Sequence, residues 1–310
     1  MTMATLSFAC PACHAALSQS APDEMLCPTE GLHFRRIEGI WRFLLPERTA
    51  HYERFVREYE TVRRAEGRGA AEPAYYRALP YKDLSGQMRA DWRIRAVSFD
   101  ALLDRVVAPL ERDSPRMRVL DLGAGNGWLS NRLAERGHAV AAVDLLTNDF
   151  DGLGCYRQYT TAFQPIQTEF DRLPLLDGQT DLLIFNASLH YSVDIRATLR
   201  EALRVLGPQG CLVILDSPVY RDARSGMQMV AEREAQFVRR FGFASNALSS
   251  QNFLTYQQIG ELGAELGVTW RLLTPGYGLG WALKPLKATL LGRREPAKFH
   301  LIVGEPLKAS

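Results

Sequence analysis

Residues 119–130, VLDLGAGNGWLS, pass from an apolar run through a glycine-rich loop and back into a helical pattern. Asp121 lies within the apolar run, and glycines follow at positions 123, 125 and 127. Glycine adopts backbone dihedrals that other residues rarely adopt, and it lets a ligand approach the main chain closely. Open parallel sheets bind ligands at the carboxyl ends of their strands. The stretch therefore predicts a strand, a ligand-binding loop and a helix.

From about residue 115 onward, short apolar runs alternate with longer helical patterns. Strands that are apolar on both faces and are separated by helices predict a mostly parallel α/β sheet covered on each side. The helical patterns fall near 126–137, 193–206, 222–241 and 255–267, and Thr255 with Gln258 forms a capping-box signature. The seven expected strands are MRVLDL, HAVAAVD, FQPIQTE, TDLLIFNAS, GCLVILD, GVTWRLL and FHLIVGE.

The chain before this sheet divides into two parts. Residues 1–47 carry three cysteines and several prolines, and we expect them to form a small head that needs a metal for stability. Residues 48–112 are expected to form a helical lid or linker, with helices over 51–66 and 88–110 and a loop between them over 72–86. Residues 113–310 are expected to form the main domain.

Composition narrows the class of protein. The chain has 310 residues, 46% of them hydrophobic, and a net charge of +2, which by itself does not indicate a nucleic-acid partner. No apolar run is long enough to span a bilayer, so we expect no membrane insertion. Five cysteines without a disulfide-type framework fit a reducing compartment, and we expect the protein in the cytoplasm. The sequence does not indicate an oligomeric state.

A second acidic residue indicates what the glycine loop binds. Asp144 ends the second apolar run, 23 residues after Asp121, where an acid accepts hydrogen bonds from ribose hydroxyls. Asp121 precedes the first glycine by two residues; it would repel a pyrophosphate and would suit a cationic amino group. The pattern therefore favours a positively charged nucleoside over a dinucleotide.

These residues resemble motif I of the class I S-adenosylmethionine-dependent methyltransferases, and the resemblance extends over about 115–305. It implies a Rossmann-like, seven-stranded, mostly parallel sheet and S-adenosylmethionine as cofactor. Glu169 and Phe170 resemble the family's adenine contacts, and RVLGPQG at 204–210 resembles the turn before its fifth strand. The cofactor-binding residues expected are Asp121, Gly123, Ala124, Gly125, Asn126, Gly127, Asp144, Leu145, Glu169, Phe170, Asn186 and Ala187, with Arg95 on the methionine carboxylate.

The segment after the fourth strand is similar to the family's segment beside the transferred methyl group. It contains His190 and Tyr191, which we take as catalytic candidates. His190 is either a general base, because histidine titrates near neutrality, or a wall of the pocket. Further candidates for acceptor binding are rich in tyrosine and tryptophan, which favours an aromatic or lipid-like small molecule. They are Tyr75, Tyr76, Tyr81, Trp92, Asp216, Pro218, Tyr220, Tyr277 and Trp281.

The head carries a cysteine pair and a third cysteine. Cys10, Cys13 and Cys27 provide three ligands for tetrahedral zinc, and the fourth is His33 or Glu30. The head resembles the zinc ribbon that opens the bacterial guanine-N1 ribosomal RNA methyltransferases. A head that has lost its metal and persists as a packed flap is the alternative.

Three functions follow from these features. The leading one is a methyltransferase that acts on a small molecule. The second is an RNA methyltransferase, which the ribbon resemblance and an excess of five positive charges after residue 270 favour. The third is a non-catalytic scaffold that keeps the cofactor fold and acts through its zinc head.

Overall fold

The computed structural model describes residues 6–244 and 247–307. They form a mixed eleven-stranded sheet with a layer of helices on each face. Its strand order is β1-β2-β3-β4-β7-β6-β5-β8-β9-β13-β12. Every expected strand of the main domain forms, and β13 is antiparallel to both β9 and β12. The seven strands of the main domain are β5 (Arg118–Leu122), β6 (Ala139–Asp144), β7 (Gln164–Gln167), β8 (Thr180–Asn186), β9 (Leu206–Leu215), β12 (Val268–Leu273) and β13 (Leu301–Pro306).

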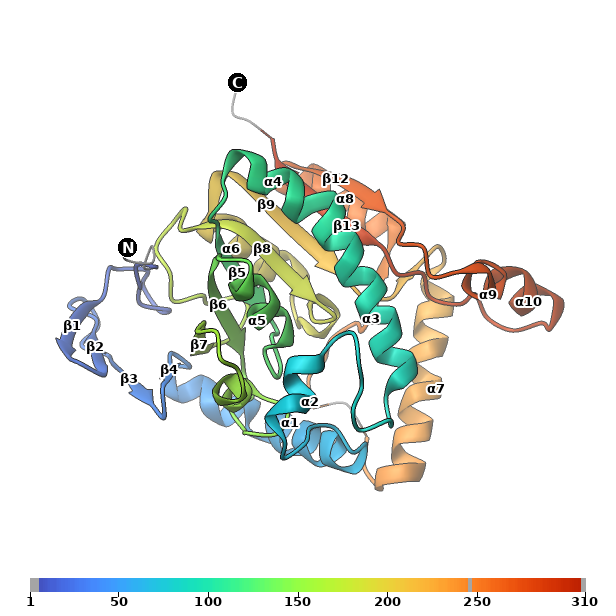
Figure 1. Cartoon of the computed structure of the whole chain (residues 1–310), viewed down its shortest axis with the longest axis horizontal. Coiled ribbons are helices and arrows are strands. Elements are labelled where there is room, and N and C mark those ends of the chain that lie inside the picture. The colour runs from blue at the N-terminus through green and yellow to red at the C-terminus, as the bar shows by residue number, and fades with distance from the viewer. Residues whose placement is uncertain (1–5, 245–246, 308–310) are drawn as a thin grey trace.

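Helices cover both faces of this sheet (Figure 1). Alternate residues along one strand point to opposite faces, so Val119 packs with Phe99 and Leu133, whereas Leu120 packs in a second core with Leu199. The first face is covered by α3 (Arg89–Leu102), a π-helical turn (Leu103–Val107), α4 (Ala108–Asp113) and α5 (Trp128–Glu135); the second by α6 (Ile195–Val205) and α8 (Tyr256–Leu266). The sheet is therefore buried on both sides, as its apolar strands predict.

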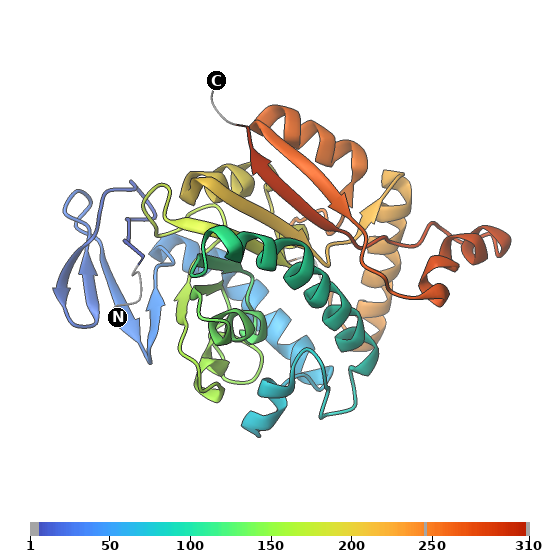
Figure 2. The same ribbon diagram turned by 45° about the horizontal axis from the view of Figure 1, so that its top comes forward.

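The head extends the sheet instead of standing apart from it. Strand β4 pairs in parallel with β7, with Trp41 opposite Ile166, so the expected seven-stranded sheet is a continuous eleven-stranded one. Figure 2 shows the head beyond β7 at one end of the molecule. Phe34, Trp41 and Phe43 of the head belong to the same hydrophobic core as side chains of β5, β6 and β8. Burial of these three aromatic rings holds the head against the main domain. The head strands are β1 (Ser18–Ala21), β2 (Glu24–Leu26), β3 (His33–Ile37) and β4 (Ile40–Arg42).

The segment expected as a loop over 72–86 contains a short helix, α2 (Pro73–Ala78), so that expectation is wrong in part. Pro73 suits the first turn of a helix because its missing N–H needs no partner there. The helix buries Tyr75 and Tyr76, and the Tyr76 hydroxyl donates to the Phe150 carbonyl at 2.8 Å. Burial of these two rings outweighs the loop-like composition.

The remaining elements connect the strands of the main sheet or precede it in the chain. Among the described residues, no helix is long and apolar enough to cross a membrane. These elements are α1 (Pro46–Ala65), α7 (Ala223–Phe241), α9 (Leu279–Ala282), α10 (Lys284–Leu290), the 3-10 turns Leu153–Gln158 and Leu189–Tyr191, and the paired strands β10 (Val219–Tyr220) and β11 (Leu254–Thr255). In Figure 1 the α9–α10 segment projects from the end of the molecule opposite the head.

The expected cap of α8 gives a test of the fold. The Thr255 hydroxyl accepts the Gln258 backbone N–H at 3.1 Å, and the side chain is buried. Thr255→Ala removes this acceptor, and we expect the free energy of unfolding to fall by about 1 kcal/mol. Urea denaturation measures the change. Thr255→Ser keeps the oxygen and should retain most of the stability; equal losses in both variants would contradict the capping role.

Candidate functional site

A cavity of about 490 Å³ opens at the carboxyl ends of β5, β6, β8 and β9. Helix α1 contributes part of its wall, so the cavity lies between the sheet edge and the segment expected as a lid. Most of the expected site residues line it: Gly123, Ala124, Gly125, Asn126, Asp144, Leu145, Glu169, Phe170, Asn186, Ala187, His190, Tyr191 and Arg95. Asp121 and Gly127 do not line this cavity.

Gly123, Gly125 and Gly127 of the loop differ in the space around them. All three have positive φ, which other residues adopt only with strain. A Cβ on Gly123 would lie 2.3 Å from Ser188 Cβ, and one on Gly127 would lie 2.7 Å from a Phe163 ring atom, so both positions are required by packing. A Cβ on Gly125 would meet only the Asp151 carbonyl, at 3.7 Å. Gly125 therefore leaves its main chain open toward the cavity, as a closely approaching ligand requires.

The two strand-tip acids are held in different environments. The Gly125 and Leu146 backbone N–H groups donate to the two Asp144 oxygens at 2.8 and 2.9 Å, which fixes that carboxylate at the cavity wall. Asp121 is fully buried and accepts the Ser130 hydroxyl at 2.7 Å. Burial raises the pKa of Asp121 to about 7. Asp144 thus faces the cavity, whereas Asp121 lies behind the loop and bonds Ser130.

One end of the cavity is closed by contacts between α1 and Glu169. The Arg48 guanidinium donates to Glu169 at 2.7 Å, and the Tyr52 hydroxyl donates to it at 2.8 Å. The ion pair raises the pKa of Arg48. Glu169, expected as an adenine contact, is thus already bonded by α1, while Phe170 packs edge-on against Phe185 and lines the cavity beside it. Sequence reasoning missed Arg48 and Tyr52, since only the fold brings them to residue 169.

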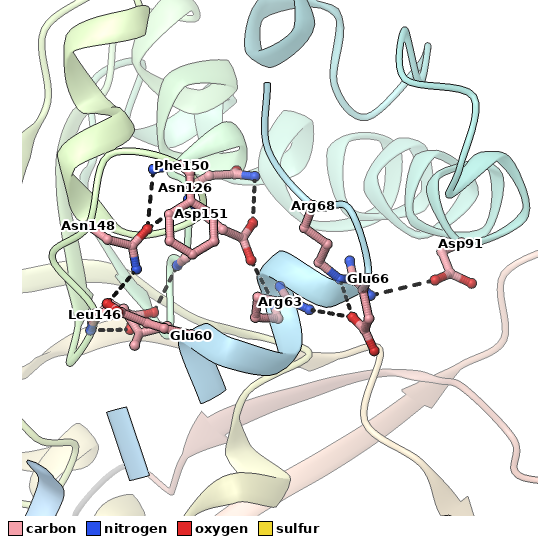
Figure 3. Close-up of polar contacts among 12 residues, drawn as sticks. Glu60, Arg63, Glu66, Arg68, Asp91, Asn126, Leu146, Asn148, Phe150 and Asp151 are labelled. Carbon is pink, nitrogen blue, oxygen red and sulfur yellow. Dashed lines mark hydrogen bonds and ion pairs between the residues drawn. The ribbon is translucent and has the colours of Figure 1, made fainter. Parts of the chain in front are cut away.

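A second set of contacts joins α1 to the loop after β6 (Figure 3). Arg63 forms an ion pair with Asp151 at 2.5 Å, and Asp151 also accepts the Asn126 side-chain amide at 3.3 Å. The Asn148 amide donates to Glu60 at 2.8 Å. These contacts connect the glycine loop, the loop after β6 and the helix that covers both.

Arg95, from α3, lines the same cavity. Its guanidinium stacks on the Trp92 ring at 4.9 Å, and no carboxylate in the described part of the chain lies within ion-pair distance of it. Burial and the nearby cations Arg68 and Arg63 lower its pKa. By contrast, Arg63 and Arg68 pair with Asp151 and Glu66. Arg95 is therefore the cation of this wall that remains available to an anionic group.

Asn186 at the end of β8 and Asp216 just after β9 both line the cavity, and each has one buried oxygen without a partner among the described residues. Asn186 Oδ1 and Asp216 Oδ2 accept no hydrogen bond from any described residue, and both residues are buried, with 9% of their surface exposed. The two tips are adjacent because Asn186 pairs with Leu215. The Ser98 hydroxyl donates to the other Asp216 oxygen at 2.5 Å and lies 2.9 Å from the Tyr277 hydroxyl. Buried acceptors normally have partners, so this edge fits a bound molecule that carries hydrogen-bond donors.

His190 lies in the cavity wall with its ring 7% exposed. Its Nδ1 lies 3.1 Å from the Ser217 hydroxyl, and its ring centroid is 4.4 Å from that of Tyr191. Burial, with Arg233 and Arg95 nearby, lowers its pKa to about 3. The imidazole is consequently neutral near pH 7 and a weak proton acceptor, which favours the pocket-wall alternative over the general base.

The head brings the three cysteines together. The sulfur atoms of Cys10, Cys13 and Cys27 lie within 4.8 Å of one another. Burial raises the pKa of Cys27, but the backbone N–H groups of Glu30 and Thr29 outweigh it and lower the pKa overall. Burial raises the pKa of Cys10 to about 11. Three clustered thiols with amide donors to one sulfur fit a thiophilic metal.

Neither expected fourth ligand joins the cysteine cluster. His33 lies in β3 opposite Leu26, and its Nδ1 is 3.5 Å from Glu24. The Glu30 backbone N–H, not its carboxylate, contacts Cys27 Sγ at 3.3 Å. Within the described residues, only the three cysteines form a group with metal-ligand spacing.

Part of the chain is similar to known methyltransferases. A family model for a methyltransferase domain matches residues 120–214. An uncharacterised methyltransferase of Mycobacterium tuberculosis is 38% identical over 109 residues, 35% of this chain and 42% of the relative. The tRNA 5-carboxymethoxyuridine methyltransferase of Escherichia coli is 32% identical over 123 residues, 36% of this chain and 44% of that enzyme. The chain thus spans less than half the length of these curated relatives.

Among solved structures, the YcgJ protein of Bacillus subtilis is 15% identical, with a TM-score of 0.45 over 63% of this chain and 93% of that one. The family match contains the glycine loop, Asp144, Asn186 and His190. Residues 120–214 thus match a methyltransferase domain, and the described sheet with helices on both faces has a Rossmann-like α/β arrangement.

The low pKa of His190 predicts how stability depends on pH. The pKa falls from its ordinary value of 6.5 to about 3, so between these pH values the unfolded chain binds a proton that the folded chain does not. Stability should therefore fall as the pH falls below 6.5. We expect wild type to lose about 2 kcal/mol more than His190→Gln between about pH 7 and about pH 5. Urea denaturation at each pH measures this difference; parallel losses would show that His190 titrates normally.

Proposed function

We propose that the whole protein is a methyltransferase that uses S-adenosylmethionine to methylate a small molecule. The observation that supports this most strongly is the pairing of Asp144 with the open main chain of Gly125 at one wall of the cavity. A carboxylate held by backbone amides at the tip of the second strand suits a ribose diol. The match to a methyltransferase domain model over residues 120–214 supports the same reaction.

The cavity residues suggest how the cofactor is held. Asp144 would accept the ribose hydroxyls, and Leu145 and Phe170 would flank the adenine. Gly123 to Asn126 would carry the methionine portion along the main chain. Arg95, which has no carboxylate partner among the described residues, would bind the methionine carboxylate, because a guanidinium can hold a carboxylate through two hydrogen bonds.

The acceptor would lie at the tips of β8 and β9. When bound, S-adenosylmethionine supplies an activated methyl group together with its own leaving group. The protein then has to align the acceptor with that methyl, and positioning of this kind can lower a barrier by ~7–11 kcal/mol. Asn186 and Asp216 line the cavity there, and in this proposal their side chains would turn to accept hydrogen bonds from the acceptor and so orient its nucleophile.

Asp216 is a better proton acceptor in this proposal than His190. Burial raises the pKa of Asp216, whereas it lowers that of His190 to about 3. A nucleophile that carries a proton would form its bond to the methyl carbon as the carbon–sulfur bond breaks. The bonding electrons would go to sulfur, and the proton would go to Asp216 Oδ2. His190 and Tyr191 would shape the wall beside this point.

The remaining wall supports an aromatic or lipid-like acceptor. Phe55 and Tyr59 of α1 line the main cavity, and together with Tyr191 they also line an adjoining cavity of about 190 Å³. Phe237 and Phe243 also line that second cavity, which the charged residues Glu58, Arg63, Glu66, Arg68 and Arg233 line as well. Aromatic walls of this kind bind flat or extended apolar groups.

RNA is the alternative acceptor. One relative is by name a tRNA methyltransferase, although it matches over only 36% of this chain. The enclosed aromatic walls around Tyr59 favour a small molecule. The intact glycine loop and Asp144 at one wall of the cavity argue against the scaffold alternative, so catalysis is the stronger proposal.

We further propose that the head binds zinc through Cys10, Cys13 and Cys27. The clustering of the three sulfurs supports coordination of a thiophilic metal by thiolates. His33 or Glu30 would have to turn toward the cluster to complete four ligands; a water could take that place instead. The metal would stabilise the head, since none of the three cysteines lines the cavity.

Cytoplasmic location remains our proposal for the cell. Cys10, Cys13, Cys27, Cys155 and Cys211 are all free thiols. Free cysteines persist in a reducing compartment, where metal coordination by thiolates is also favoured.

Cofactor binding tests the proposed function directly. We expect wild type to bind S-adenosylhomocysteine and Asp144→Ala to bind it ~10- to 100-fold more weakly, because the ribose loses charge-assisted hydrogen bonds. Isothermal titration calorimetry measures both affinities. Asp149→Ala, which changes an exposed acid in the same loop, should bind like wild type. An affinity that survives the loss of Asp144 would rule out this pose.

Metal analysis tests the head. Purified protein should contain about one equivalent of zinc per chain, and Cys27→Ser should lose most of it. Cys155→Ser, at a buried thiol outside the cluster, should keep the metal. Inductively coupled plasma mass spectrometry measures the content, and wild type with less than about a tenth of an equivalent would refute the zinc site.

A further inference from the structure

The α9–α10 segment carries an exposed leucine stripe, defined as Leu279, Leu283, Leu286 and Leu290. Their spacing of four, three and four residues places them on one helical face. They are 84%, 58%, 59% and 77% exposed, respectively, and Leu291 beside them is 52% exposed. Figures 1 and 2 both show this segment projecting away from the body of the protein. A contiguous exposed apolar face of this kind marks an interaction surface.

The charges around the stripe select the partner. Lys284, Lys287, Arg293 and Arg294 lie in or directly after α10, and no acidic residue occurs from 278 to 294. Arg294 pairs with Glu232, whereas no carboxylate of the described ranges lies within ion-pair distance of Lys284 or Lys287. A symmetric contact between two copies would bring these like charges together, which disfavours self-association. A surface that is both apolar and anionic complements the segment.

We propose that residues 279–291 dock onto the surface of a bilayer that contains anionic lipids. The leucine stripe would enter the boundary between headgroups and acyl chains, and the lysines would contact lipid phosphates. Lys284 Nζ lies 3.3 Å from the centroid of the Trp281 ring, which places an amphipathic ring and a cation at one edge of the stripe. Docking of this kind needs no membrane-spanning helix.

The docking segment is connected to the acceptor end of the cavity. The Trp281 ring contacts Tyr277 and Phe299, at centroid distances of 5.1 and 5.7 Å. Phe299 lines the main cavity, and the Tyr277 hydroxyl lies 2.9 Å from that of Ser98, which bonds Asp216. A membrane-resident acceptor would thus reach the cavity beside the docked segment. The docking proposal is independent of the proposed methyl transfer. The proposal that the acceptor comes from the membrane rests on that function.

Vesicle flotation of the full chain tests the docking. The probes are phosphatidylcholine vesicles with and without phosphatidylglycerol. Wild type should bind the anionic vesicles at least ~10-fold more strongly than the neutral ones. Replacing Leu279, Leu286 and Leu290 together by serine should lower that binding at least ~10-fold. A matched control replaces three exposed apolar residues elsewhere, Leu84, Met227 and Val238, and should bind like wild type.

Three results would overturn the docking proposal. The first is that wild type does not bind anionic vesicles. The second is that the leucine variant binds them as strongly as wild type does. The third is a leucine-dependent dimer in sedimentation velocity without vesicle binding, which would assign the stripe to a second copy of the chain. Each variant is also titrated with S-adenosylhomocysteine, so that loss of docking is distinguished from loss of folding or of the proposed cofactor site.

Discussion

The bond between the Gly125 main chain and Asp144 is the contact on which the site depends. It joins the loop after β5 to the tip of β6, and it needs a glycine at positive φ with its free face toward the cavity. Gly123 and Gly127 make that loop possible by allowing close contacts with Ser188 and Phe163. The parallel register of β5 and β6 brings the two partners to one edge. Cofactor binding in our account therefore follows from sheet topology and from three positions without side chains.

Helix α1 turns this open edge into an enclosed site. Arg48 reaches Glu169 at one end and Arg63 reaches Asp151 at the other, so the helix is held at both ends by ion pairs with the loops that it covers. Arg63 contacts the same Asp151 that bonds Asn126 of the glycine loop.

Local patterns predicted much of this molecule, and contacts between distant segments account for the rest. The glycine loop, Asp144 and the cap of α8 could be predicted because each depends on neighbouring residues. Arg48 could not, because its partner is 121 residues away in the chain, and the partner of Arg63 is 88 residues away. His33 was expected near the cysteines from its spacing, but pairing with Leu26 places it beside Glu24. The sequence predicts Asp216 only as one of several acceptor-binding candidates. Its unpaired oxygen could not be predicted, because it depends on which residues the fold brings around it.

The same limit applies to the sheet. The seven strands of the main domain could be predicted from their apolar runs, whereas the addition of the head to β7 depends on a pairing between residues 41 and 166 that no local pattern encodes.

The central claim is that Asp144 and the Gly125 main chain bind a nucleoside. A crystal structure of the protein with S-adenosylhomocysteine tests it most directly. Our account predicts the ribose on Asp144 and the methionine portion along residues 123–126; ligand density elsewhere, or none in this cavity, would contradict it.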